Sequence, residues 1–336
     1  MNIDTRLNQL KDWASQSLAH SVTLKPMLGD ASFRRYYFIE EQPKLIAVDS
    51  PPASENNQGF IAIAQHFQNL GLNVPQIEHQ DLHQGFFIVS FIAGKLLHNT
   101  LNLDNCTTIY HQAIDQLITI QKNPAPHFYQ PPEFNAIKLT NELEGFQDWF
   151  IHELIHYELN GEEHYHIIKC FEKLIQNAVN QPYVVMHRDY HSRNLLWQPD
   201  HSPPIGILDF QDTVMGPITY DLVSLIRDCY ITWPDAVVRE CVQYYYFKAK
   251  NEALLQGVSF DQFMRWFDWM GLQRHLKAIF IFARKYLRDY NDGYLQYIEP
   301  TLQYINHVTE QYDELAPLHE LISMNLIPLW TELQTL

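Results

Sequence analysis

The sequence is poor in cysteine and in basic residues, and it contains no long apolar run. Its four cysteines, Cys106, Cys170, Cys229 and Cys241, lack the CxxC spacing of zinc ribbons and redox sites. Disulfides and a zinc ribbon are therefore not expected, and each thiol is predicted to be a small buried apolar residue. No segment has the length of a membrane span, and the N-terminus lacks the apolar core of a signal peptide. These features predict a cytoplasmic protein.

Acidic residues outnumber basic residues by 39 to 23, which gives a formal net charge of −16. Binding to nucleic acid or to an anionic membrane depends on clustered lysine and arginine. Neither partner is expected here, and we expect a monomer that binds small molecules. A phosphate-bearing ligand would have to be held by a metal ion and a few local cations.

The apolar periodicity changes along the chain, which is long enough for two lobes. Residues 4–19 have helical spacing. Short runs broken by turn residues predict a five-stranded antiparallel meander, with a helix at 54–70 between its third and fourth strands. The strands are expected at 23–28, 34–40, 45–48, 76–82 and 85–91. Helices are expected at 104–122, 141–159, 163–179, 219–231, 235–250, 260–289 and 297–312. The predicted fold class is therefore α+β, with a small antiparallel-sheet lobe (1–91) and a large helical lobe (92–336).

Two predicted strands in the large lobe each end in a carboxylate. Asp189 follows the run 184–186, and Asp209 closes the run 205–208. Asn194 follows Asp189 after four residues. Transfer of a phosphoryl group needs an oxygen base for the attacking hydroxyl and hard oxygen ligands for Mg²⁺. These residues supply that inventory, whereas an isolated aspartate after a strand is most often a turn or capping residue.

The motifs HRDYHSRNLL (187–196) and LDFQDTVMGPITYDL (208–222) resemble the signature of the aminoglycoside phosphotransferase and choline kinase-like superfamily. The resemblance implies a two-lobed, protein-kinase-like fold with ATP and Mg²⁺ bound between the lobes. It also implies that Asp189 is the catalytic base, that Asn194 and Asp209 are metal ligands, and that Asp221 is a buried strut for the loop. Arg193 is expected to stabilise the γ-phosphate through its positive charge.

Within this superfamily, several segments are similar to the bacterial anomeric kinases of N-acetylmuramate and N-acetylglucosamine, which serve peptidoglycan recycling. The similarity implies ATP-dependent phosphorylation of a sugar C1 hydroxyl. The alternatives are a kinase of an aminoglycoside or another small alcohol, and a nucleotide-binding module without turnover. The segments are GDASFRRYY (29–37), AVDSPP (47–52), HRDYHSRNLL (187–196), DFQD (209–212), YDLVSLIRDCYITWP (220–234) and GLQRHLKAIFIFARKYLRD (271–289).

The segment 29–37, which includes Ser32, lies between the first two predicted strands, where a phosphate-covering loop belongs in this fold. Strand alternation places Arg34 and Tyr36 on one face and Arg35 on the other. We expect the Arg34 face to be the nucleotide side, with Tyr36 under the adenine. The simpler alternative is a hairpin with solvated arginines. The resemblance also implies that the backbone from Val89 to Phe91, at the lobe connector, holds adenine.

The third predicted strand departs from the kinase pattern, because Asp49 stands where a lysine would pair with phosphates. A carboxylate cannot replace an ammonium group in that role. Either Arg34 or Arg35 supplies the charge, with Glu55 as its ion-pair partner, or binding depends more on Mg²⁺.

The segment after Asp221 and a late helix carry the candidate acceptor-binding residues. Carboxylates and amides bind sugar hydroxyls, aromatic side chains pack under sugar rings, and cations suit an anionic acceptor. Tyr230 and Trp233 could equally belong to the core. The candidates are His191, Arg227, Asp228, Trp233 and Arg274, with Tyr230 and Lys277 nearby.

His152 and His156 have the spacing of two zinc ligands on one helix face. No third ligand follows at metalloprotease spacing, because position 159 is Leu and position 162 is Glu. We therefore interpret the pair as part of a solvated helix face, with a zinc hydrolase as the remote alternative.

Overall fold

The computed structural model describes residues 4–27 and 33–335, and the chain divides into two compact units. The small unit comprises the residues up to Thr100 together with 123–131 and 193–213. The helical unit comprises 101–122, 132–192 and 214–336. Two segments beyond the predicted boundary at residue 91 therefore pack with the N-terminal residues.

The small unit is built on a five-stranded antiparallel sheet in the order β1-β2-β3-β5-β4. The predicted meander is wrong in this respect, because β5 rather than β4 lies beside β3. The inner strand β5 is almost wholly buried, whereas β4 is largely exposed and polar and occupies the edge. The elements are α1 (Thr5–Ser17), β1 (Leu24–Pro26), β2 (Arg35–Ile39), β3 (Leu45–Asp49), α2 (Asn57–Asn69), β4 (Ile77–Asp81) and β5 (Phe86–Ser90).

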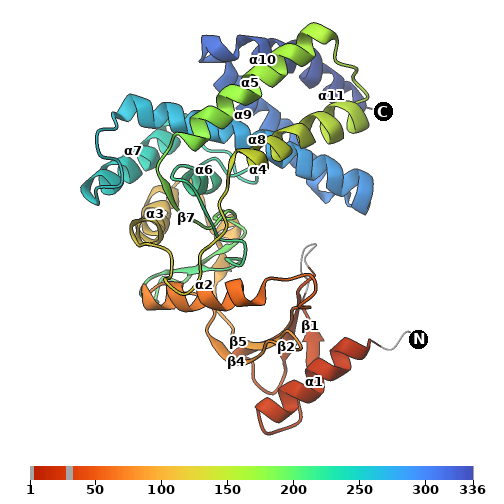
Figure 1. Ribbon diagram of the computed structural model, residues 1–336, viewed down its shortest axis with the longest axis vertical. Coiled ribbons are helices and arrows are strands. Elements are labelled where there is room, and N and C mark those ends of the chain that lie inside the picture. Colours follow the sequence, from red (N-terminus) through yellow and green to blue (C-terminus); the bar gives the residue numbers. More distant parts are fainter. Residues whose placement is uncertain (1–3, 28–32, 336) are drawn as a thin grey trace. The chain divides into compact units, whose positions relative to one another are not determined.

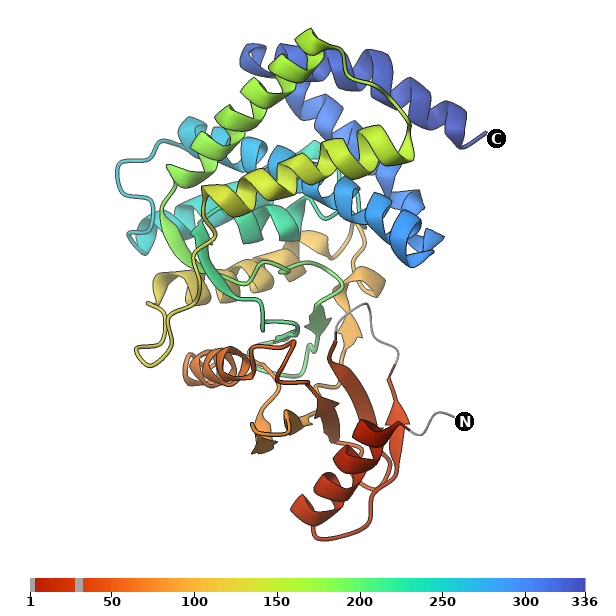
Figure 2. The same ribbon diagram turned by 45° about the vertical axis from the view of Figure 1, so that its right-hand side comes forward.

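The two faces of this sheet pack against different helices. Helix α1, red in Figure 2, places Leu10 and Ala14 in one apolar cluster with Tyr37 of β2. Helix α2 contributes Phe60, whose ring contacts Phe87 of β5 with centroids 5.5 Å apart. The alternation predicted for the second strand is confirmed, because its odd-numbered residues face α1.

Two smaller sheets lie next to the loops that contain Asp189 and Asp209. In the small unit, β8 pairs with β6 and β9, and in the helical unit, β7 pairs with β10. The strands predicted at 184–186 and 205–208 are present as β7 and β9, one in each unit. The strands are β6 (Lys95–Leu96), β7 (Tyr183–Met186), β8 (Leu195–Trp197), β9 (Ile205–Ile207) and β10 (Val214–Pro217).

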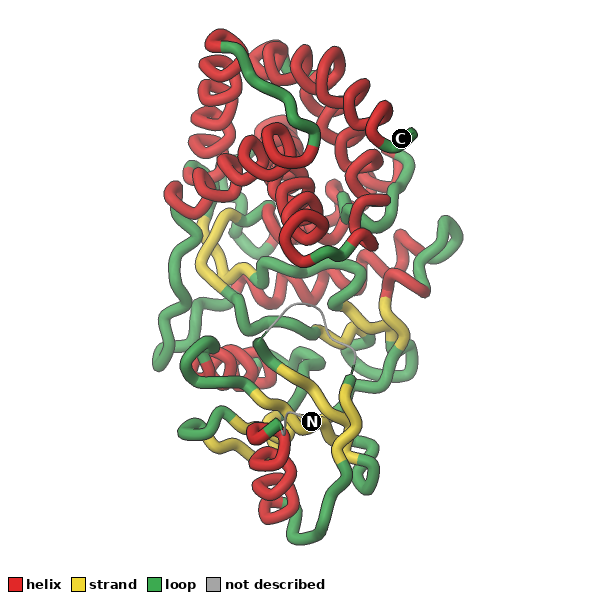
Figure 3. The backbone as a smooth tube through the Cα atoms, turned by 90° about the vertical axis from the view of Figure 1, so that its right-hand side faces the viewer, coloured by secondary structure: helices red, strands yellow, loops and turns green. Residues whose placement is uncertain are grey.

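Helices make up most of the helical unit (Figure 3). All the helices predicted from residue 104 onward are present with two changes, and one of these is that the helix predicted at 219–231 ends at Ile226. The helix predicted at 141–159 is instead α4, which ends at Gly145, followed by the π-helical segment η2 as far as Leu154. The sequence analysis did not predict α10, η5 and α11, which are each no longer than seven residues. The helices are α3 (Cys106–Lys122), α4 (Ala136–Gly145), α5 (Gly161–Val179), α6 (Tyr220–Ile226), α7 (Asp235–Asn251), α8 (Phe260–Asp289), α9 (Ile298–Glu310), α10 (Ala316–Glu320) and α11 (Ile327–Leu333).

Helix α8 is central to the helical unit and packs against α4, α5, α6 and α9 (Figure 1). Its buried positions are mostly apolar, but they include Asp268, Gln273, Arg274 and His275. Buried polar groups on a core helix need partners or a ligand. All four cysteines are buried and free, as predicted. Within the described residues, no helix is long and apolar enough to cross a membrane.

Candidate active site

The loop after β7 is held at its first residues by Asp221. This buried carboxylate accepts the backbone N–H groups of His187 (2.6 Å) and Arg188 (2.9 Å). Arg188 has a left-handed backbone conformation (φ 77°), which is unfavourable for a side chain of its size. Burial raises the pKa of Asp221 to about 7, although the two N–H groups act in the opposite direction. The strut role predicted for Asp221 is confirmed.

A second buried carboxylate, Asp228, holds the other end of the same loop. Its Oδ2 accepts the backbone N–H of Ser192 (3.0 Å), and its Oδ1 accepts that of Tyr230 (2.9 Å). The sequence analysis placed Asp228 among the acceptor-binding residues. In the structure both of its oxygens hold backbone groups, so the loop that carries Asp189 is fixed at two points.

Asp189 lines a cavity of about 100 Å³ in the helical unit. Burial acts to raise the pKa of Asp189, but Lys277, then His191, Arg188 and Arg274, outweigh it and lower the pKa to about 2. Asp189 is therefore ionised at physiological pH. The cavity wall also includes Asp228, Cys229, Tyr230, Ile281 and Phe282.

Of the other predicted acceptor residues, three line this cavity and two lie elsewhere. His191 and Arg274 line it, as does Asp228. The ring of His191 lies edge-on to Tyr230, with centroids 5.5 Å apart, and burial lowers its pKa. Arg227 instead pairs with Asp268 (2.7 Å). The buried Trp233 donates from Nε1 to the hydroxyl of Tyr110 (2.8 Å), which is the core position considered for it.

In the small unit, Asn194 and Asp209 lie side by side at the ends of neighbouring strands. Asn194 directly precedes β8, Asp209 follows β9, and the N–H of Leu208 donates to the carbonyl of Asn194 (2.9 Å). The Asn194 amide nitrogen lies 3.3 Å from Oδ2 of Asp209, and Gln211 also donates to Asp209. Carboxylate and amide oxygens suit Mg²⁺, so the pair fits the predicted metal site.

Phe210, the residue after Asp209, packs against other aromatic residues of the small unit. Its ring stacks on Phe60 of α2, with centroids 5.4 Å apart and an interplanar angle of 1°, and lies edge-on to Phe67. Asp209 itself has a left-handed backbone conformation (φ 62°). The aromatic contacts of Phe210 therefore fix the backbone directly after Asp209. They help to hold Asp209 in its unfavourable left-handed conformation.

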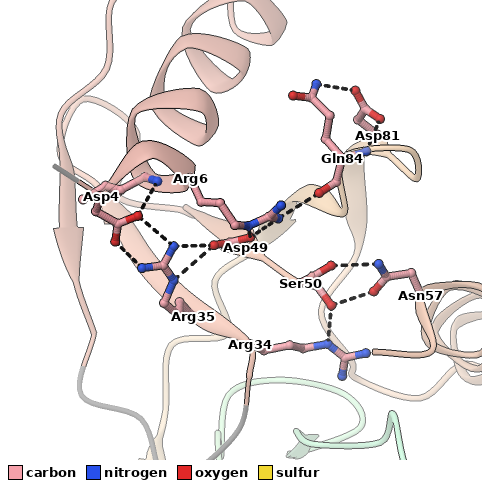
Figure 4. A network of polar contacts seen from close by, with 10 residues as sticks. Asp4, Arg6, Arg34, Arg35, Asp49, Ser50, Asn57, Asp81 and Gln84 are labelled. Carbon is pink, nitrogen blue, oxygen red and sulfur yellow. Dashed lines mark hydrogen bonds and ion pairs between the residues drawn. The ribbon is translucent and has the colours of Figure 1, made fainter. Parts of the chain in front are cut away.

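Arg34 is buried in the small unit, with its guanidinium 4.9 Å from the centre of the Phe60 ring. Its Nε donates to the hydroxyl of Ser50 (2.9 Å; Figure 4), and its Nη2 pairs with Glu55 (3.3 Å). Burial raises the pKa of the neighbouring Tyr36 to about 12; Arg34 acts to lower it, and Asp209 and Glu55 act to raise it. The predicted ion pair with Glu55 is thus confirmed for Arg34.

Asp49, at the position of the missing lysine, faces the opposite side of the sheet (Figure 4). Its buried carboxylate accepts hydrogen bonds from Nε of Arg6 (2.9 Å) and Nη2 of Arg35 (2.6 Å), and Arg35 also pairs with Asp4. Asp49 therefore ties helix α1 to strands β2 and β3. Of the two arginines considered for phosphate binding, Arg35 is engaged in this network.

The remaining nucleotide-side residues are less distinctive. Val89 is buried in β5, and the exposed Phe91 lies edge-on to Phe38, with centroids 5.7 Å apart. The N–H of Phe91 donates to the carbonyl of Lys44 (2.7 Å). Arg193 is half-buried directly before the predicted metal ligand at 194. Ser32 lies outside the described residues.

The two histidines with zinc-like spacing do not share a helix face. The segment η2 ends at Leu154, and His156 lies beyond it in a left-handed conformation (φ 52°). His152 instead contacts the carbonyl of Tyr157 through Nδ1 (3.2 Å). The prediction of one solvated helix face is wrong, because the helix stops before the second histidine.

Comparisons with known proteins show the family to which the chain belongs. Residues 23–256 match the phosphotransferase enzyme family, and the chain belongs to that family. An N-acetylmuramate/N-acetylglucosamine kinase of Pseudomonas aeruginosa is 33% identical over 335 residues, covering 96% of this chain and 98% of its own. The protein of the same name from Neisseria meningitidis serogroup B is 34% identical over 300 residues, covering 88% of each chain.

Solved structures share the fold at low sequence identity. An ADP-bound aminoglycoside phosphotransferase has a TM-score of 0.61 at 14% identity, covering 90% of this chain and 98% of its own. A choline kinase from Streptococcus pneumoniae has a TM-score of 0.62 at 12% identity, covering 90% of this chain and all of its own. The predicted fold class, a small antiparallel-sheet lobe with a large helical lobe, is confirmed.

The sequence analysis missed some residues around the cavity, notably Glu142 of α4. Glu142 accepts from Nε2 of Gln273 (2.9 Å) and pairs with Arg188 (3.6 Å). The spacing of Arg274, Lys277, Ile281 and other lining residues along α8 was a usable signal, because residues three and four apart share a helix face. Contacts across different helices left no such local signal.

Proposed function

We propose that this chain transfers the γ-phosphoryl group of ATP to the anomeric hydroxyl of N-acetylmuramate and N-acetylglucosamine. The observation that carries the proposal is the position of Asp189, on a loop fixed at both ends, in a cavity that also holds two cations and aromatic side chains. The names of the relatives support this choice of acceptors. We further propose cytoplasmic peptidoglycan recycling as the setting.

The residues predicted for catalysis and metal binding have distinct chemical roles in this reaction. Asp189 accepts a hydrogen bond from the sugar hydroxyl, orients it and takes its proton as the bond to phosphorus forms. An anomeric hydroxyl is more acidic than other sugar hydroxyls, so a carboxylate with a low pKa is adequate. Asn194 and Asp209 would hold Mg²⁺, which neutralises phosphate charge when bound.

On the nucleotide side, the ion pair of Arg34 with Glu55 takes the part that a strand lysine and a helix glutamate have in protein kinases. Arg34 would contact the phosphates, together with Arg193. Tyr36 and the backbone from Val89 to Phe91 would hold the adenine.

The charge of the cavity argues against an aminoglycoside as the acceptor. Arg274 and Lys277 would repel a polycation next to Asp189. An acceptor that is neutral or anionic suits the same surface.

ADP release with a panel of amino sugars, aminoglycosides and choline tests the proposal. We expect turnover with N-acetylmuramate and N-acetylglucosamine. Turnover with kanamycin-like acceptors alone would assign an antibiotic kinase instead, and nucleotide binding without turnover on any acceptor would assign a binding module.

A further inference from the structure

Two cations of α8 project into the cavity that contains Asp189. Arg274 and Lys277 lie three positions apart, so their side chains share one face of the helix. Arg274 is 7% exposed. Burial acts to lower the pKa of Lys277, but Tyr220, Glu142 and Asp189 raise it overall, so the amine stays charged.

Neither cation has a carboxylate partner within 4.0 Å among the described residues of the helical unit. Lys277 donates to the hydroxyl of Tyr220 (3.3 Å), and the guanidinium of Arg274 lies 5.9 Å from the centre of the same ring. Nε of Arg274 is buried without an acceptor. A buried charge without a directly bonded partner of opposite charge is unfavourable, and a bound anion would relieve that cost.

The neighbouring acids are already engaged. Asp228 accepts two backbone N–H groups, and Glu142 accepts from Gln273 and pairs with Arg188. Asp189 is the base that the reaction requires. By contrast, Arg227, one helix away, has its own carboxylate in Asp268 (2.7 Å). Arg274 and Lys277 therefore share the cavity with Asp189 and Asp228, but neither cation forms a direct ion pair with a carboxylate of the described residues of this unit.

We propose that Arg274 and Lys277 form a carboxylate subsite that binds the lactyl group of N-acetylmuramate. The inference rests on the proposed function and adds to it the basis of acceptor choice. The lactyl group carries one carboxylate and one methyl, and the cavity offers two cations beside Ala278 and Ile281. N-acetylglucosamine lacks this group, so neither cation gains a directly bonded carboxylate when it binds. N-acetylmuramate is therefore the preferred acceptor.

The test is the ratio of kcat/KM for N-acetylmuramate to kcat/KM for N-acetylglucosamine. Both cations also act on the pKa of Asp189, but that effect is common to the two sugars and cancels in the ratio. Lys277→Met and Arg274→Met keep the apolar stem and remove the charge. We expect each to lower the ratio by about 10- to 100-fold, the range for a lost charge-assisted hydrogen bond. Lys277→Arg should restore most of it.

The matched control is Arg288→Met, which removes an exposed cation from the end of the same helix and should leave the ratio unchanged. Equal losses for both sugars in the Lys277 and Arg274 variants would overturn the subsite and assign the cations to Asp189 or the phosphoryl group. Values of kcat/KM that stay at those of the parent for both sugars would also overturn the subsite and would place the lactyl group elsewhere.

Calorimetry with the methyl glycosides of the two sugars separates this inference from the proposed function. These compounds lack the free anomeric hydroxyl and report binding alone. Binding of the muramate glycoside that weakens in Lys277→Met, without turnover of either sugar, would support the subsite and contradict the kinase. Turnover of both sugars with a ratio insensitive to both variants would do the reverse.

Discussion

The arginines on the sheet of the small unit have carboxylate partners, whereas the two cations in the cavity of the helical unit do not. Arg35 pairs with Asp4 and Asp49, and Arg34 pairs with Glu55. Arg274 and Lys277 have no such partner among the described residues of their own unit.

We interpret this difference as two uses of charge. The ion pairs of the small unit stabilise the fold, and the cations of the cavity are available to bind a ligand. The Asp49 network joins α1 to the sheet, so its arginines are part of the structure. The cations of the cavity form no direct ion pair with a carboxylate of the described residues of their unit, and they act on Asp189 by lowering its pKa. Arg34 is intermediate, because it pairs with Glu55 and is also the residue that we propose to contact the phosphates.

Replacing the base should give the largest effect. Asp189→Asn keeps the size of the side chain but removes the proton acceptor, so we expect kcat to fall by about 10²- to 10⁴-fold while the affinity for ATP changes little. Steady-state kinetics and calorimetric nucleotide binding measure the two quantities. Asp200→Asn, at an exposed position, is the control. A parallel loss of ATP affinity would assign Asp189 to the nucleotide or the metal.

The two arginines of the second strand should differ in their effect on ATP. Arg34→Met should raise the KM for ATP about 10- to 100-fold, because a charged contact to phosphate is lost, and the KM for the sugar should change little. Arg34→Lys should recover part of the loss. Arg35→Met is the matched comparison, and its KM for ATP should stay close to that of the parent. If the two Met variants behave alike, the division of roles between the two faces is wrong.

Breaking the Asp49 network should cost stability and leave nucleotide kinetics intact. Asp49→Asn weakens the hydrogen bonds from Arg6 and Arg35, and we expect the free energy of unfolding in urea to fall by about 1–3 kcal/mol. The loss should be below that of a fully buried pair, because both arginine side chains reach solvent. Asp12→Asn, exposed on α1, is the control. Unchanged stability together with an altered KM for ATP would place Asp49 at the nucleotide.

The contribution of His275, which is buried in α8, should change only on acidification. Burial lowers its pKa to about 3, although the hydrogen bond to the carbonyl of Arg227 acts in the opposite direction. Between pH 6.5 and 3 the unfolded chain binds this proton more readily, so the contribution of His275 to stability is lost as the pH falls, by at most about 1.4 kcal/mol per pH unit.

The contribution of Asp221 to stability instead increases as the pH falls over part of this range, because its pKa is raised to about 7 in the folded protein. The difference between the parent and His275→Gln therefore isolates the histidine. Urea unfolding at pH 7, 6 and 5 should show a smaller loss on acidification in His275→Gln. Parallel curves for the two proteins would mean that His275 does not titrate below its ordinary range.

Local patterns predicted the strands next to Asp189 and Asp209, whereas features that depend on contacts between distant parts of the chain were not predicted. Asp189 and Asp209 follow strands, and Asn194 lies at a fixed spacing after Asp189, so the sequence alone indicated their order. The position of β5 beside β3 depends on burial of a whole strand, and the choice of Arg274 over Arg227 depends on which carboxylate each one meets. Neither fact is encoded in a short stretch of sequence.

The position of phosphate on the product tests the central claim most directly. After reaction of the parent protein with ATP and N-acetylmuramate, phosphorus and proton NMR should show phosphate coupled to the anomeric proton and loss of the reducing-end signal. A phosphate on the C6 hydroxyl, or an unmodified sugar despite ADP release, would contradict the account.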